Sequence, residues 1–137
     1  MLHVNDSVCR NNMIVAGHDA GIELAWVDGV KVHHNTVWRE NVQGRGIRCI
    51  EKLANVEIVN NLCRGALALT GTETARNNLI GPLEGMFVNP AAGDLRLTAS
   101  AAATILKAVP LAAVTDDIDG RERGAEPTLG AAQFVPQ

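Results

Sequence analysis

Aromatic residues are scarce in this chain. Its 137 residues include two tryptophans, two phenylalanines and no tyrosine. Stacked rings often form the binding platforms for sugars and single-stranded nucleic acids, so their scarcity weighs against both kinds of ligand. Charge of one sign is not concentrated either, since the net charge is −3 and no block of like charges occurs. The sequence therefore predicts no nucleic-acid partner.

Long apolar runs are missing as well. The most apolar stretch, residues 98–114, is interrupted by Lys107 and Pro110, and it is shorter than a membrane-spanning helix requires. We therefore expect no membrane partner. The opening residues MLHVNDSVCRNN lack the basic and apolar regions of a signal peptide, so the sequence as it stands is expected to be cytoplasmic.

Motifs for metals, cofactors and nucleophiles are also lacking. Cys9, Cys49 and Cys63 have no CxxC spacing, which favours buried thiols. The segment DDIDGRERGAEPT fails as an EF-hand loop, because Arg121 and Thr128 occupy the positions of an oxygen ligand and of the bidentate glutamate. No phosphate-binding loop, GxGxxG motif or nucleophile elbow occurs. We expect neither a metal nor a cofactor.

An asparagine recurs in similar segments through the first two-thirds of the chain. The segments are VCRNNMIV, KVHHNTVW, EIVNNLCR and TARNNLIG, and their aligned asparagines are Asn12, Asn35, Asn61 and Asn78. The spacings are 23, 26 and 17 residues, and one turn of a β-solenoid commonly takes a little over twenty. Differences in length would fall in surface turns. We predict that these asparagines stack as a hydrogen-bonded ladder.

Apolar and polar residues alternate around each asparagine. The positions three before and two after it are apolar: Cys9, Val32, Ile58, Ala75 and Ile14, Val37, Cys63, Ile80. The position two before it is mostly polar: Arg10, His33, Val59 and Arg76. Such alternation predicts a short strand with one buried face.

A second short strand follows most of these segments. GIEL, GIRCI and GALAL begin at Gly21, Gly46 and Gly65, and the stretches WVDGVKV and KLANVEI return the chain to the next asparagine. The strands are too closely spaced for the helices that connect ordinary parallel strands. The sequence therefore predicts an all-β fold over residues 1–88, a single-stranded parallel β-helix of about four coils.

These motifs resemble the right-handed parallel β-helix repeat of the pectate-lyase-like superfamily. The resemblance rests on GI…VKVHHNTV…GIRCI…NVEIVNNLC and covers roughly residues 5–90. It implies a right-handed coil. It implies no single activity, because the superfamily includes polysaccharide lyases, glycoside hydrolases, phage tailspikes, adhesins and proteins with no known reaction. Its members are commonly secreted.

The composition changes after Asn89. NPAAGDLRL predicts a turn and a short strand, and TASAAATILKAV predicts a short helix with Thr98 or Ser100 as its N-cap and Pro110 as its end. The order of these segments, followed by DDIDGRER and LGAAQF, resembles the C-terminal end of secreted β-helix proteins. We therefore predict that residues 89–137 cap the coils within the same structural domain.

No comparable cap precedes the first coil, because MLHVNDSV supplies part of a strand at most. Self-association about a two-fold axis would cover that coil. We therefore expect a homo-oligomer, a dimer or a tetramer. The stretch ALALTG suggests an interface: if Ala66 and Ala68 face inward, Leu67 and Leu69 face outward and require a partner.

The adjacent His33 and His34 are the obvious candidates for a chemical site. Neighbouring residues of a regular strand point to opposite faces, so the two cannot bind one metal ion. We expect His34 at the turn beside the ladder and His33 in a solvent-facing row with Arg10, Val59 and Arg76. The adjacent row holds Val8, Lys31, Glu57 and Thr74, with successive coils about 4.8 Å apart.

A face with these cations suggests an acidic oligosaccharide as ligand. The resemblance to polysaccharide lyases implies His33 or Arg76 as a catalytic base and Lys31 as the cation that neutralises the substrate carboxylate. Valines interrupt both rows, however, and no aspartate cluster typical of calcium-dependent lyases or polygalacturonase-type hydrolases occurs. We therefore favour a function without catalysis.

The turn VWRENVQGRGIR, residues 37–48, is the longest and most charged. Trp38, Arg39, Arg45 and Arg48 are its candidate binding residues, because long insertions in solenoids often carry the binding surface. The alternative is a solvated loop with weak local ion pairs.

Two functions remain. The first is a non-catalytic structural or binding module that self-associates through its uncapped coils. The second is a carbohydrate-active protein, or the remnant of one, which binds or cleaves an acidic polysaccharide near His33.

Overall fold

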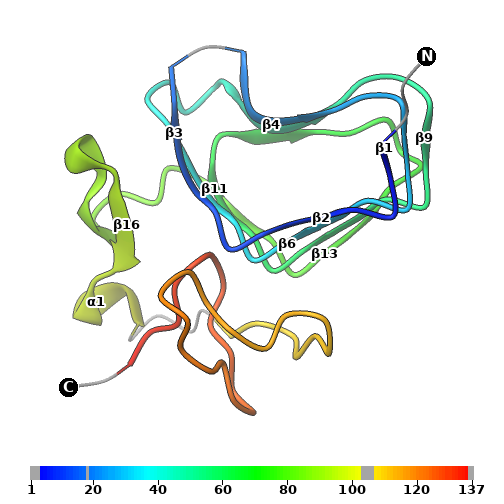
Figure 1. Ribbon diagram of the computed structural model, residues 1–137. Coiled ribbons are helices and arrows are strands. Elements are labelled where there is room, and N and C mark those ends of the chain that lie inside the picture. Colours follow the sequence, from blue (N-terminus) through cyan, green and yellow to red (C-terminus); the bar gives the residue numbers. More distant parts are fainter. Residues whose placement is uncertain (1–3, 18, 103–106, 136–137) are drawn as a thin grey trace.

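The computed structural model describes residues 4–17, 19–102 and 107–135. Most of its strands lie in four parallel sheets, an arrangement compatible with a parallel β-helix (Figure 1). The N-terminal sheet, sheet A, contains β1 (Val4–Asn5), β5 (Val27–Asp28) and β9 (Leu53–Ala54). Sheet B contains β2 (Val8–Arg10), β6 (Lys31–His33), β10 (Glu57–Val59) and β13 (Thr74–Arg76).

The remaining parallel strands form two further sheets. Sheet C contains β3 (Met13–Ala16), β7 (Thr36–Arg39), β11 (Leu62–Arg64) and β14 (Leu79–Ile80). Sheet D contains β4 (Ala20–Leu24), β8 (Arg45–Cys49) and β12 (Ala66–Ala68). The described chain passes through sheets A to D in this order three times, and then through B and C once more.

The residues that the alternation places inward form one core between the sheets. Val32, Val37 and Ile58 have no exposed surface, and they belong to a cluster with Ile22, Ile47 and Cys63. Each pass alone would leave its apolar face in water, so burial depends on stacking. The predicted rows are confirmed by the register, because Lys31 is paired with Val8 and Glu57, and His33 with Arg10 and Val59.

Glycines at or just before the start of the sheet D strands allow the sheets to approach closely. A Cβ atom at Gly46 would lie 1.9 Å from the Sγ of Cys63, and one at Gly21 would lie 2.4 Å from a methyl group of Val37. No side chain fits at that separation. The glycine of each GI or GA pair is therefore a packing requirement of the corner between sheets C and D.

The leucines of ALALTG do not face outward as predicted. Leu67 is paired with Ile47, and both Leu67 and Leu69 are half-buried and pack against the inner cluster. A register shift between Ala66 and Leu67 changes the alternation at this point. A one-residue slip moves every following side chain to the other face of a strand, so the predicted orientation was wrong.

The described part of residues 89–137 lies beside the ring of strands when the molecule is viewed along the stack (Figure 1). The strands β15 (Phe87–Asn89) and β16 (Asp94–Leu97) form an antiparallel pair around a 3₁₀ turn, Pro90–Ala92. The short helix α1 (Ala99–Ala102) follows. Its predicted N-cap is confirmed, because Thr98 Oγ1 accepts a hydrogen bond from the Ala101 amide at 3.2 Å. Residues 103–106 of the predicted helix lie outside the described residues.

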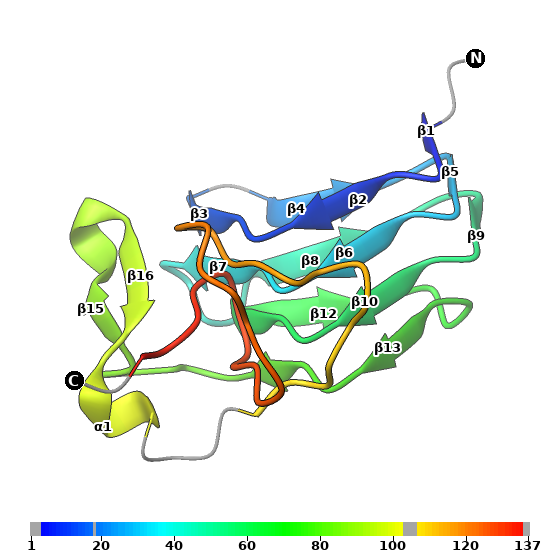
Figure 2. The same ribbon diagram turned by 60° about the horizontal axis from the view of Figure 1, so that its bottom comes forward.

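Residues 107–135 then run over the outer side of the sheets, and we call them the strap (Figure 2). Side chains at the turns between sheets B and C form hydrogen bonds with backbone amides and carbonyls of the strap. A second core cluster, which includes Leu62, Phe87, Leu95 and Leu129, joins the hairpin, the strap and sheet C. None of the helices in the described part of the chain has the length and apolar composition of a membrane-spanning segment.

Candidate functional site

The asparagine ladder is present as predicted. The Nδ2 of Asn12 donates to Asn35 Oδ1 at 2.9 Å, that of Asn35 donates to Asn61 Oδ1 at 3.1 Å, and that of Asn61 donates to Asn78 Oδ1 at 2.9 Å. The backbone N–H of the first three donates to the same oxygens. Asn35 and Asn61 have no exposed surface, so the ladder satisfies polar groups that would otherwise be buried without partners.

A second row of polar residues lies immediately before the ladder. These residues are Asn11, His34, Asn60 and Asn77, with φ angles of 55°, 54°, 63° and 56°. Asparagine tolerates this left-handed conformation better than most residues, and histidine is also enriched there. The left-handed turn directs these side chains away from the core and toward the strap, which they bind through at least one hydrogen bond each.

His34 joins the strap to the second row. Its Nδ1 lies 3.3 Å from the carbonyl oxygen of Gly130, and its Nε2 lies 3.1 Å from Asn60 Nδ2. A carbonyl only accepts and an amide nitrogen only donates, so Nδ1 carries the proton and the ring is neutral. Burial, and to a lesser extent the nearby Arg123 guanidinium, lower the pKa of His34 to about 3.

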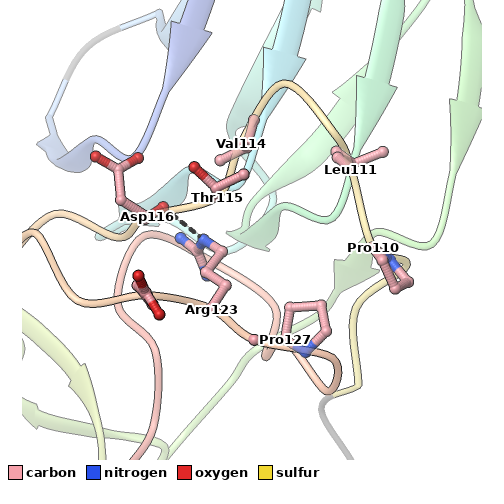
Figure 3. Close-up of a pocket in the computed structure, with 9 residues that line it drawn as sticks. Pro110, Leu111, Val114, Thr115, Asp116, Arg123 and Pro127 are labelled. Carbon is pink, nitrogen blue, oxygen red and sulfur yellow. Dashed lines mark hydrogen bonds between the residues drawn. The ribbon is translucent and has the colours of Figure 1, made fainter.

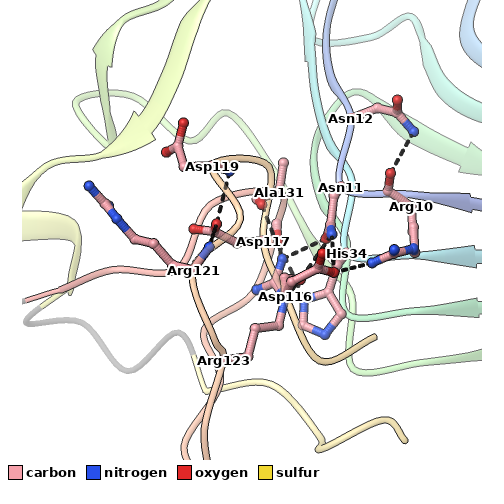
Figure 4. A network of polar contacts seen from close by, with 11 residues as sticks. Arg10, Asn11, Asn12, His34, Asp116, Asp117, Asp119, Arg121, Arg123 and Ala131 are labelled. Atoms are coloured by element: carbon pink, nitrogen blue, oxygen red, sulfur yellow. Dashed lines mark hydrogen bonds and ion pairs between the residues drawn. The ribbon is translucent and has the colours of Figure 1, made fainter. Parts of the chain in front are cut away.

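Arg123 is the centre of the strap's polar contacts (Figure 4). Its guanidinium donates to Asn11 Oδ1 at 2.7 Å and to backbone carbonyls of the strap: Asp116, Thr128, Gly130 and Ala131. The residue is buried, and burial lowers its pKa to about 10 against the opposing effect of nearby aspartates. Asp116 in turn forms an ion pair with Arg10 of β2. The guanidinium therefore holds the strap together and fixes it to the first pass.

The strap closes the site predicted at His33. Only 3% of His33 is exposed, and neither of its ring nitrogens has a hydrogen-bond partner among the described residues. Nε2 lies 3.9 Å from the Glu57 carboxylate, and burial lowers the pKa of His33 despite that carboxylate. His33 does lie in the outward row, but the strap runs from Asn60 to Arg10 across this part of sheet B. The predicted solvent exposure of His33 was therefore wrong.

Lys31 and Arg76, the other residues of the predicted catalytic group, remain outside the strap. Lys31 is half-buried and Arg76 is exposed. Lys31 lines an open groove of about 420 Å³ with Asp6, Asn55, Glu57 and Thr74. The groove therefore contains two carboxyl groups and one ammonium group, a balance that does not favour an acidic ligand.

The charged turn at residues 37–48 is largely structural. Trp38 packs edge to face on Phe87, with ring centroids 5.7 Å apart, while the Arg64 guanidinium lies 4.6 Å from the Trp38 ring centroid. Arg39 is buried and donates to the Ala16 carbonyl at 3.2 Å. Trp38 and Arg39 thus attach the hairpin and the turn to sheet C, which makes them poor ligand contacts.

The two other arginines of that turn lie further from the hairpin. Arg48 pairs with Glu23 at 3.2 Å on the outside of sheet D, and Arg45 is exposed. Exposed pairs of this kind contribute little to stability. The structure therefore does not bring the predicted binding residues of residues 37–48 together into one concave site.

A cavity of about 300 Å³ lies within the strap (Figure 3). Pro110, Leu111, Val114 and Pro127 form its apolar walls, and Arg123 and Asp116 lie at its polar side. Both charged groups are engaged: Arg123 Nε donates to the Asp116 carbonyl at 2.8 Å, and the Asp116 carboxylate pairs with Arg10. The cavity therefore offers a ligand few free polar groups.

The edges of the stack are open within the described residues. No strand pairs with the free edges of β2, β3 and β4 at one end or of β13 and β14 at the other. Inward-facing residues are consequently accessible there: Cys9 and Ile14 are half-exposed, and Ile80 is 38% exposed. An unpaired edge beside exposed apolar side chains is a template for further strands.

Sequence reasoning predicts that Arg121 or Arg123 bonds the backbone of a structural turn, and Arg123 does so, but it missed Asp116 and Asn60 among the residues that hold the strap. The signal for Asn60 was present, because asparagine also precedes the ladder residue in three segments. Among the described residues, no group of three or more His, Cys, Asp or Glu residues is placed to hold a metal ion. Comparisons with protein-family models, curated proteins and solved structures gave no match to this chain.

Proposed function

We propose that the protein is a non-catalytic parallel β-helix module that associates with further copies of itself through its open strand edges. We assign it to the pectate-lyase-like superfamily, with a right-handed stack of about four coils, on the sequence resemblance described above. The observation that carries the proposal is the pair of open edges, where inward-facing Cys9, Ile14 and Ile80 reach solvent.

Association is the physical consequence of those edges. Each edge presents backbone groups that make hydrogen bonds in every interior strand. It also presents apolar surface whose removal from water contributes about 25 cal/mol per Å². Val8 and Val15 lie on the same end and are each 48% exposed, which adds apolar surface beside the edge.

Catalysis at His33 is disfavoured by its enclosure. A general base must reach the proton that it removes and must have a pKa near the working pH. His33 is covered by the strap, and burial lowers its pKa. The outer face of sheet B therefore supports the strap in this proposal.

Binding of an oligosaccharide is the second candidate, and the groove beside Lys31 supports it. Its lining comes from successive passes at Asp6, Lys31, Glu57 and Thr74, so the groove follows the stack and suits an elongated ligand. The loss of glycan binding in Lys31→Ala, with unchanged melting temperature, would support this function. No binding across a panel of neutral and acidic oligosaccharides would remove it.

Sedimentation velocity over a wide concentration range tests self-association. We expect the average mass to rise with concentration. Ile14→Lys places a charge on the inward-facing edge position and should shift the protein toward monomer. Val15→Lys is the matched comparison on the same strand: Val15 points outward beside the edge, so its replacement should weaken association less than Ile14→Lys. A monomer at every concentration would refute the proposed function.

A further inference from the structure

The asparagine ladder has a direction. In every step the earlier asparagine donates, through both its backbone N–H and its Nδ2, to the Oδ1 of the later one. The ends of the ladder are therefore chemically different. Asn12 Oδ1 receives no hydrogen bond from the described residues, and the Asn78 N–H finds no acceptor among them.

We propose that copies of this chain stack head to tail, so that the β13–β14 edge of one copy meets the β2–β3 edge of the next. This inference rests on the proposed function and adds its geometry. The donors of Asn78 would then reach Asn12 Oδ1 of the following copy and continue the ladder. A two-fold contact between identical ends would instead oppose acceptor to acceptor at the Asn12 ends or donor to donor at the Asn78 ends, so it would continue no ladder bond.

One backbone bond at the start of sheet C repeats from pass to pass. Thr36 N donates to the Asn12 carbonyl at 2.9 Å, and Leu79 N donates to the Asn61 carbonyl at 2.9 Å. The later pass donates in each case. A following copy would bring its Met13 N–H, which is equivalent to Thr36 N in register, to the Asn78 carbonyl. Both sets of bonds are therefore completed by the same head-to-tail contact.

The side chains at the two ends also match by row. Cys9 and Ala75 occupy one inward row, and Ile14 and Ile80 occupy another. Stacking would place each beside its counterpart at about 4.8 Å and remove it from water.

The outward row brings Arg10 beside Arg76 of the preceding copy. Like charges in facing positions are unfavourable. The Asp116 carboxylate, which pairs with Arg10, offsets this repulsion. The contact between Arg10 and Arg76 of two copies therefore requires the Asp116 carboxylate of the strap to compensate their charge.

The contact involves two of the four sheets. Sheets B and C have four strands, whereas A and D have three, so the last pass offers only β13 and β14 to a following copy. We therefore expect reversible association. Because each copy keeps one free head and one free tail, the contact does not close, and assemblies grow with concentration.

Disulfide trapping tests the geometry with a thiol that the chain already has. Ala75→Cys would place a new thiol at the tail, beside Cys9 at the head of the next copy. Neighbouring parallel strands bring Cα atoms to about 4.8 Å, within the range of about 4.4–6.8 Å that a disulfide spans. Cys49 and Cys63 are buried and should not react.

After mild oxidation, Ala75→Cys should give a series of disulfide-linked oligomers. Peptides spanning each disulfide should join position 75 to Cys9. Thr74→Cys is the matched control, because Thr74 lies in the outward row beside Val8, and it should cross-link far less. Adding Cys9→Ser to Ala75→Cys should abolish these covalent oligomers.

The possible failures are distinguishable. Oligomers whose junctions join Cys9 to Cys9, or position 75 to position 75, would overturn the head-to-tail geometry and leave self-association intact. A monomer without any junction would overturn both.

Discussion

The side-chain amide of Asn60 pairs with both backbone polar groups of Val109. Its Nδ2 donates to the Val109 carbonyl at 2.7 Å, and the Val109 N–H donates to its Oδ1 at 3.0 Å. This two-point contact fixes the orientation of the amide. A flipped amide would place Nδ2 against the Val109 N–H and Oδ1 against the Val109 carbonyl, so donor would face donor and acceptor would face acceptor. The Nδ2 is thereby also directed at His34 Nε2.

Asn60→Ala should therefore release the strap before it unfolds the sheets. The change leaves the half-buried backbone groups of Val109 and the buried Nε2 of His34 without partners, and a buried group without a partner costs about 1–3 kcal/mol. We expect faster hydrogen exchange and proteolysis in the strap, measured by mass spectrometry. Asn77→Ala is the matched control in the same row, since Asn77 is exposed and its loss should cost less. Equal protection of the strap in both variants would contradict this role.

The sequence predicts the repeating part of this structure better than the site. Each strand of a solenoid contacts equivalent strands, so the alternation around Asn35 is enough to predict both the ladder and the inward row of Val32. The strap depends on contacts such as that of Arg10 with Asp116, which are 106 residues apart. No local pattern encodes such a contact, and the burial of His33 follows from it. The bulge at Ala66 was missed because alternation assumes an unbroken register.

Acidification should destabilise the protein through His34. The pKa of His34 is about 3 in the folded chain and about 6.5 in an unfolded one. The unfolded chain therefore binds the proton more tightly, and the stabilisation is fully present above pH 6.5 and decreases as the pH falls toward 3. The slope is at most about 1.4 kcal/mol per pH unit for one group.

Urea unfolding at several pH values measures this slope. His33, whose pKa burial also lowers, adds to it with the same sign, and Arg123 opposes the charging of His34. His34→Asn continues the asparagine row without a titrating group, so its slope between pH 6.5 and 5 should be smaller than that of the unmodified chain. An unchanged slope would show that protonation of His34 does not contribute to the pH dependence of the free energy of unfolding.

Replacement of Arg123 should loosen the strap more than any other single change to a charged residue. A lysine cannot reach Asn11 and four carbonyls from one position, because it lacks the planar guanidinium. We expect Arg123→Lys to lower the free energy of unfolding by about 2–4 kcal/mol, as for other broken buried networks. Arg121→Lys is the control on an exposed side chain, and it should stay within about 0.5 kcal/mol. Similar melting temperatures for the two variants would contradict the central role of Arg123.

Position along the ladder should determine the cost of losing an asparagine. Asn35 donates to Asn61 Oδ1 and to the Cys9 carbonyl and accepts from Asn12, so Asn35→Ala leaves several groups unpaired inside the stack. Asn12 is only half-buried, and water can replace the partner that Asn12→Ala removes. Chemical denaturation should show a loss of about 2–4 kcal/mol for Asn35→Ala and about 1 kcal/mol for Asn12→Ala. Equal losses would mean that the ladder contributes through local turns rather than through its buried interior.

Head-to-tail stacking would bury Asn12. The loss of stability in Asn12→Ala should therefore rise with protein concentration, whereas the loss in Asn35→Ala should not.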